Sequence, residues 1–132
     1  MKKCNITFKS IADGVCVDTQ IKGDYNTKNN MSLISFQLED ENEIQKFAFS
    51  ILKDGSVRLT KSGNSNYSLL FKKGSSQVSF IKSNNYTISL STKTTYLQTK
   101  IEESKILIDC KYILTLGGGD SFNSFYILAE EI

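Results

Sequence analysis

Apolar and polar residues alternate along most of this chain, and the stretch from Val57 to Gly74 shows the pattern most clearly. In this stretch the alternation runs on both sides of the turn-forming residues Ser62-Gly63-Asn64. Alternation with period two places the apolar residues on one face of a strand. Gly and Asn reach the positive φ values that hairpin turns require. The pattern therefore predicts two strands joined by a turn at residues 62–64.

Similar segments fill the rest of the sequence, separated by turn signals such as Asp13-Gly14 and Lys53-Asp54-Gly55 at intervals of roughly 8 to 12 residues. Residues 44–52 contain good helix formers, but the short distance between the flanking turn signals favours a strand. Between Thr92 and Glu103 the alternation weakens. We expect one extended strand with an irregularity there.

These segments predict an all-β protein with a single domain over residues 1–132 and no helix. About 8 to 10 strands joined by short turns indicate an antiparallel, up-and-down arrangement. A flat sheet of this size would expose two edges and one apolar face, so we expect the sheet to close into a β-barrel. The interior of a barrel of about eight strands is either filled by side chains or holds one small ligand.

Composition agrees with a globular domain whose core needs no metal or disulfide: 39% of the 132 residues are hydrophobic and 23% are charged. The net charge of +2 and the single arginine, Arg58, argue against nucleic-acid binding. No apolar run has the length of a signal peptide or a membrane-spanning helix, so we expect a cytoplasmic protein without a membrane partner. Cys4 and Cys110 share a strand face with apolar residues, whereas Cys16 shares one with polar residues. The alternation therefore predicts that Cys4 and Cys110 are core thiols and that Cys16 is a surface thiol.

Candidate chemistry is sparse. The chain has no histidine, which excludes the common nucleophilic triads and the commonest transition-metal ligand. The acidic residues Glu39-Asp40-Glu41 and Glu43 lack the spacing of a calcium loop and indicate a solvated hairpin tip. The run Gly117-Gly118-Gly119-Asp120 precedes a strand, so it indicates a turn and not a phosphate-binding loop. We therefore predict no catalytic residue, cofactor or metal, and no enzyme activity.

Four tyrosines lie on the strand faces that the alternation assigns to the barrel interior: Tyr25, Tyr86, Tyr112 and Tyr126. A buried tyrosine hydroxyl needs a hydrogen-bond partner. Such hydroxyls could orient a ligand inside the barrel. Alternatively, the tyrosines pack at the barrel ends with their hydroxyls toward water or the backbone.

The chain also resembles the YwiB-like family, small bacterial proteins of unknown function with a calycin-like β-barrel. The matching positions run from Ile6-Thr7-Phe8-Lys9-Ser10 through residues 57–63, Phe71, Gly74, Ile88, Leu90, Thr92, Ile106 and Ile108 to Asn123. The resemblance implies a calycin-like, broadly lipocalin-like fold. The family usually has Arg at the position of Lys61, which ends an inward row where calycin-like barrels often place a basic residue over an aromatic one.

The leading hypothesis is that the protein binds a small, largely apolar molecule inside the barrel. The residues predicted to line the site are Lys61, Phe71, Phe80, Tyr112 and Tyr126. The alternative is a solid-core barrel that acts as a protein–protein interaction module, with a protein partner or a second copy of the chain. An enzyme would need two titratable groups converging in a cleft, drawn from carboxylates or tyrosines.

Overall fold

The computed structural model describes residues 2–40, 43–63, 66–83 and 85–132. Within these residues the regular structure consists of ten β-strands without a helix. The strands are β1 (Lys2–Ala12), β2 (Val15–Lys28), β3 (Met31–Asp40), β4 (Glu43–Ile51), β5 (Val57–Ser62), β6 (Asn66–Phe71), β7 (Ser76–Ser83), β8 (Tyr86–Ile101), β9 (Lys105–Leu116) and β10 (Gly119–Glu131). The segment with helix-forming residues is strand β4, as its short length predicts.

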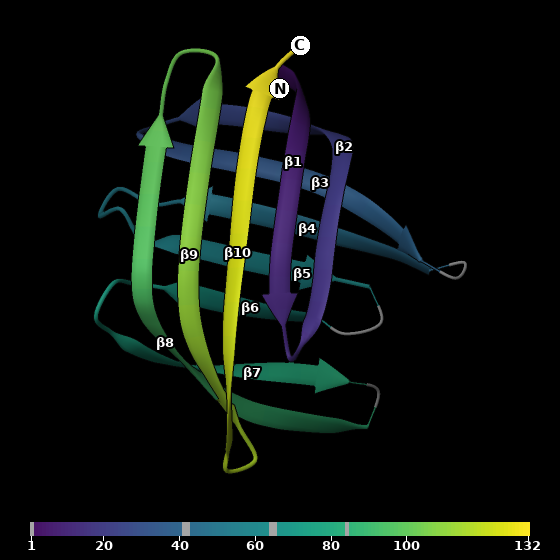
Figure 1. The fold of residues 1–132 in the computed structure, drawn as a ribbon, viewed down its shortest axis with the longest axis vertical. Helices are drawn as coiled ribbons and strands as arrows, with labels where there is room; N and C mark the ends of the chain where they lie inside the picture. The colour runs from purple at the N-terminus through teal and green to yellow at the C-terminus, as the bar shows by residue number, and fades with distance from the viewer. Residues whose placement is uncertain (1, 41–42, 64–65, 84) are drawn as a thin grey trace.

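The ten strands form one closed antiparallel barrel in which neighbours in sequence are neighbours in space (Figure 1). Strands β1 and β10 close it, with Cys4 opposite Glu131 and Ile11 opposite Ser124. The predicted up-and-down barrel is confirmed. Closure gives the first and last strands a partner on each side, which removes the sheet edges that an open arrangement would expose.

The barrel is flattened into two layers (Figure 1). Strands β8, β9, β10, β1 and β2 run vertically in the front layer, and β3 to β7 cross behind them at a steep angle. Strands β2 and β8 belong to both layers. Strand β2 pairs with β1 up to Tyr25 and with β3 from Asp24 onward. Strand β8 pairs with β7 up to Lys93 and with β9 from Ser91 onward.

Each of these two corner strands has a local feature at its bend. In β2 the bend coincides with Gly23, where a Cβ atom would overlap the carbonyl oxygen of Ser35 and the Cδ1 atom of Ile6. In β8 the pairing register shifts between Thr94 and Tyr96. Bulges and close-packed glycines allow strands to turn barrel corners. The irregularity predicted between residues 92 and 103 is therefore confirmed.

Several hairpins use two-residue turns with positive φ at both positions. Asp13 and Gly14 have φ values of 52° and 77°, and Gly117 and Gly118 have values of 61° and 83°. These values are typical of type I′ turns, whose twist matches that of paired strands. Both predicted turns are confirmed. Asn64, in the turn predicted at 62–64, and Glu41, in the acidic segment, lie outside the described residues.

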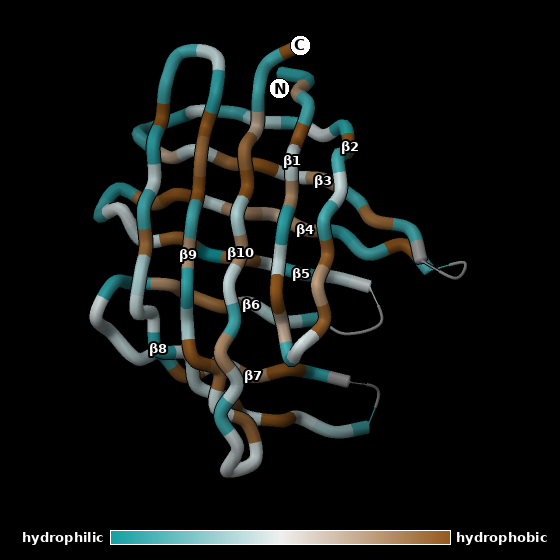
Figure 2. The backbone as a smooth tube through the Cα atoms, in the orientation of Figure 1, coloured by the Kyte–Doolittle hydropathy of each residue, from teal (hydrophilic) through white to brown (hydrophobic). Residues whose placement is uncertain are grey.

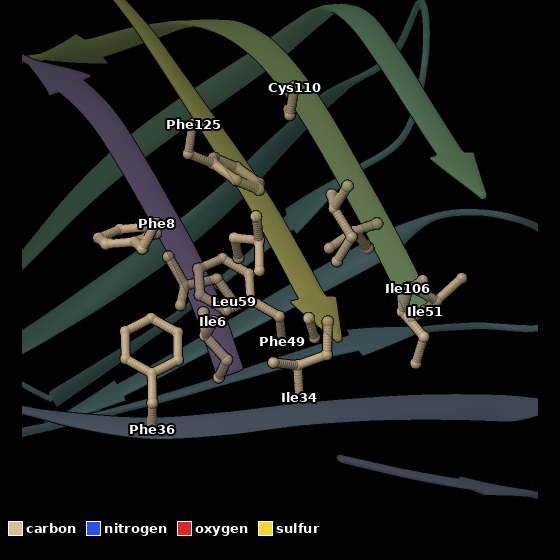
Figure 3. Close-up of a cluster of buried hydrophobic side chains, with 14 of the residues drawn as sticks. Ile6, Phe8, Ile34, Phe36, Phe49, Ile51, Leu59, Ile106, Cys110 and Phe125 are labelled. Carbon is tan, nitrogen blue, oxygen red and sulfur yellow. The ribbon is translucent and has the colours of Figure 1, made fainter. Parts of the chain in front are cut away.

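Apolar and polar residues alternate along the strands (Figure 2), and the apolar set meets between the two layers (Figure 3). Ile6, Phe8 and Phe125 from the front layer face Ile34 and Phe49 from the rear layer (Figure 3). Cys4 and Cys110 are buried and Cys16 is exposed, so the predicted distribution of thiols is confirmed.

Candidate ligand-binding cavity

A cavity of about 270 Å³ lies inside one end of the barrel. Its walls come from the ends of β1–β2, β3–β4 and β5–β6, together with β9 and β10. Its aromatic lining residues are Phe8, Phe47, Phe49, Tyr67, Tyr112 and Phe125. Val17, Leu38 and Leu59 add aliphatic surface, and Ser10, Gln45 and Lys61 add polar groups. The result is an apolar chamber with a few polar groups, the composition typical of small-molecule sites.

Ring contacts hold the aromatic walls in place. The ring centroid of Phe125 lies 5.1 Å from that of Phe49 and 5.1 Å from that of Phe71. Phe71 also packs against Tyr112, with a centroid separation of 4.7 Å. Such tilted and edge-on pairs add stability beyond the area that they bury. The cavity therefore has walls whose side chains are fixed before any ligand enters.

Lys61 introduces a positive charge into this chamber. The register of β4, β5 and β6 places Lys61 directly between Phe47 and Tyr67. Its Nζ lies 5.5 Å from the ring centroid of Phe47 and 5.6 Å from that of Tyr67, distances typical of cation–π contacts. Burial lowers the pKa of Lys61. Among the described residues, no carboxylate forms an ion pair with it.

Burial shifts the pKa values of the two cavity tyrosines, Tyr67 and Tyr112, in the opposite direction to that of Lys61. Burial raises the pKa of Tyr112 to about 12, and the neighbouring Tyr67 and Cys110 add to the rise, while hydrogen bonding from Asn123 opposes it. Burial also raises the pKa of Tyr67. Burial disfavours the charged phenolate. Both phenols are therefore protonated at neutral pH and can donate hydrogen bonds into the cavity.

Two of the five predicted site residues, Lys61 and Tyr112, line the cavity. Phe71 is fully buried and lies behind Tyr112 and Phe125, so it supports the wall without lining it. Sequence reasoning did not assign Phe8, Phe47, Phe49 or Tyr67 to the site. These residues alternate onto the same face of their strands as the core residues, and this pattern is the signal that could have assigned them to the site.

The interior positions predicted for Phe80 and Tyr126 are wrong. Phe80 is 58% exposed, because the inner face of β7 carries Ile81 instead. Tyr126 lies on the outer face of β10, because Phe125 and Ile127 are the residues of this strand that are buried in the core. Tyr86 has the inward parity but is 60% exposed near the start of β8, at the end of the β7–β8 hairpin.

Other parts of the surface offer less enclosed features. A hollow of about 470 Å³ on the outer face of β2 to β5 is open to solvent and includes the polar residues Lys22, Gln37, Lys46 and Thr60. In the described part of the chain, no group of three or more Cys, Asp or Glu side chains could hold a metal ion. The cavity inside the barrel, which is more enclosed than this hollow, is therefore the candidate ligand-binding site.

Comparison with known proteins identifies the family. Residues 6–127 match the family model described as a domain of unknown function, DUF1934. The chain belongs to the DUF1934 family. This DUF1934 chain is also similar in structure to the ywiB protein from Bacillus subtilis, known from a crystal structure, with a TM-score of 0.84. The sequences are 22% identical, and the match covers 99% of this chain and 92% of that chain.

The predicted resemblance to the YwiB-like family is confirmed by these two matches. At 22% identity the structural match shows that the two proteins share a fold. No curated protein matches this DUF1934 chain. Among its described residues there is also no helix with the length and apolar character required to cross a membrane.

Proposed function

We propose that this DUF1934 protein binds a small, largely apolar molecule in the cavity at one end of its barrel. The observation that carries the proposal is an internal chamber with aromatic walls into which only a few polar groups project. An interaction module with a solid core would instead fill this space with its own side chains. The chamber therefore supports binding inside the barrel.

The size of the chamber limits the size of the ligand. Water occupies about 30 Å³ per molecule in the liquid, so the cavity has room for about nine or ten non-hydrogen atoms. Its volume of about 270 Å³ lies just below the range of drug-sized pockets. We therefore expect one aromatic ring system or one short alkyl chain as the ligand body.

An NMR titration of the ¹⁵N-labelled protein with indole tests this function. We expect saturable shifts confined to residues lining the cavity. Val17 is half-buried in the cavity wall, so Val17→Phe should fill the chamber and abolish the shifts. Ile101 is 51% exposed at the end of β8, so Ile101→Phe is the control and should bind as the wild type does. Shifts that are absent, or that persist in Val17→Phe, would overturn the proposal.

A second candidate function is self-association through the outer face of β7. Val78 and Phe80 lie on the same face of this strand and are 69% and 58% exposed. Adjacent exposed apolar side chains are typical of interaction surfaces. Sedimentation velocity over a range of concentrations tests this role. A dimer that dissociates in the Phe80→Ser variant would support it, and a wild-type monomer at all concentrations would exclude it.

We further propose a binding role without catalysis, in the cytoplasm. The three cysteines are free thiols, which suits a reducing compartment. The absence of histidine from the sequence removes the commonest general base. Fractionation of cells that produce the protein would test the compartment, and recovery of the protein outside the cytoplasm would contradict this assignment.

A further inference from the structure

We propose that the ligand is a small monocarboxylate whose anionic group pairs with Lys61 and whose apolar body lies against the aromatic walls of the cavity. This inference rests on the proposed binding function and names the ligand class of the same site. It follows from three features of the cavity: an ammonium group without an ion-pair partner among the described residues, phenol donors in the same lining, and no second charge among the described lining residues.

The first feature is the unpaired ammonium group. Lys61 is the one charged side chain among the described residues that line the cavity. Its contacts in the described structure are the faces of Phe47 and Tyr67, and no described acidic side chain pairs with it. Ring faces attract a cation but accept no strong hydrogen bond. The ammonium donors are therefore available to an incoming acceptor.

The second feature is the set of hydrogen-bond donors in the same cavity lining. Tyr67 and Tyr112 have protonated phenols, and Gln45 has an amide in the same cavity wall. A carboxylate is an acceptor with about four lone-pair sites, and hydrogen bonds to it from charged and neutral donors are short and strong. Lys61, the phenols and Gln45 can together satisfy such a group as it leaves water.

The third feature is the number of charges. One ammonium group neutralises one negative charge, whereas a phosphate dianion would leave a second charge poorly compensated in an apolar chamber. A ligand amine would instead place a like charge beside Lys61, which is unfavourable. The walls formed by Phe8, Phe49 and Phe125 are apolar, so the rest of the ligand is a hydrocarbon chain or ring. A singly charged apolar carboxylate satisfies all these conditions.

Three probes of matched length test the ligand class: sodium octanoate, octanamide and octylamine. We expect octanoate to produce saturable NMR shifts at cavity residues with an affinity at least about tenfold higher than that of octanamide, because a charge-assisted hydrogen bond in a desolvated site is much stronger than a neutral one. Octylamine should bind more weakly than octanamide. Equal affinities for octanoate and octanamide would overturn the carboxylate inference but leave the binding function intact.

The decisive variant is Lys61→Met, which keeps an unbranched side chain but removes the charge. We expect its octanoate affinity to fall about tenfold, to the level of octanamide, with the octanamide affinity changed less than about twofold. Lys46→Met is the matched control, because Lys46 is exposed on neighbouring β4, and it should keep the wild-type preference. If Lys61→Met does not fold, as judged by its NMR spectrum, Lys61→Gln replaces it. A preference for octanoate that survives loss of the Lys61 charge would overturn the inference. Failure of octanoate to bind while indole binds would also overturn it, whereas absence of the indole shifts would overturn the binding function itself.

Discussion

The backbone N–H of Asp13 donates a hydrogen bond to Oδ1 of Asn123, at a distance of 3.1 Å. The two residues are 110 positions apart in the sequence, so the contact exists only because β1 and β10 close the barrel. Asn123 is 5% exposed, and its side chain also interacts with Tyr112 in the cavity wall. This amide thus connects the β1–β2 turn, the closing strand pair and the cavity.

Replacement of Asn123 by Leu should therefore destabilise the protein by about 0.5–1.5 kcal/mol, because the part-buried hydrogen bond from the N–H of Asp13 is lost. Urea unfolding followed by circular dichroism measures the change. Ser121→Ala, two residues earlier in the same strand, is the control and should stay within about 0.5 kcal/mol of the wild type. A loss at Asn123 no larger than that of the control would show that water satisfies the amide equally well.

The corner of β2 should not tolerate a side chain at Gly23. A Cβ there would overlap the backbone of Ser35 and the side chain of Ile6, and overpacking of a rigid core costs about 1–3 kcal/mol. We expect Gly23→Ala to lower the urea midpoint accordingly. Gly119→Ala is the matched control, because its Cβ would have its nearest contact at 3.7 Å and its φ lies outside the left-handed region. Equal stability of the two variants would mean that the bend in β2 does not depend on Gly23.

Removal of the charge of Lys61 should leave the stability of the ligand-free protein within about 1 kcal/mol of the wild type, or raise it. The cation–π contacts that are lost are worth about 0.5–1 kcal/mol each at exposed sites, while the cost of partly desolvating an ammonium group is relieved. Urea unfolding of Lys61→Met measures this balance, with Lys46→Met as the control. A loss of several kcal/mol would show that Lys61 is a structural residue and would weaken its assignment as a ligand anchor.

The protein should lose stability in alkaline solution. The pKa of Tyr112 rises from 10.0 to about 12 on folding, so the folded state retains a proton that the unfolded chain releases. The stabilising contribution is therefore complete below pH 10 and is lost as the pH rises toward about 12. Burial raises the pKa of Cys110 from 9.0 to about 12, which acts in the same direction from pH 9 upward.

Unfolding free energies measured between pH 9 and pH 12 test this linkage. Tyr112→Phe removes one titrating group, so its stability should fall less steeply between pH 10 and pH 12 than that of the wild type. Tyr126→Phe changes a tyrosine on the outer face and serves as the control for loss of a hydroxyl. Identical slopes for Tyr112→Phe and the wild type would indicate that Tyr112 does not contribute to the alkaline loss.

The strands, the turns and the closure of the sheet could be predicted from the order of the residues alone. Turns such as Asp13-Gly14 depend on local φ preferences, and strand faces depend on period-two alternation, so both can be predicted without knowing any distant contact. The same alternation predicted the burial of Cys4 and Cys110. Lys61 and Tyr112 were placed in the interior for this reason as well.

Contacts between strands distant in sequence determine which of two apolar faces turns inward and where the interior stays unfilled. In β10 both parities carry aromatic residues, so Phe125 and Tyr126 could not be distinguished until the packing against Phe49 was known. The position of Lys61 between Phe47 and Tyr67 likewise depends on the register of three strands. Alternation identifies the two faces of a strand, but pairing register and barrel curvature, which arise from contacts distant in sequence, determine what each face meets.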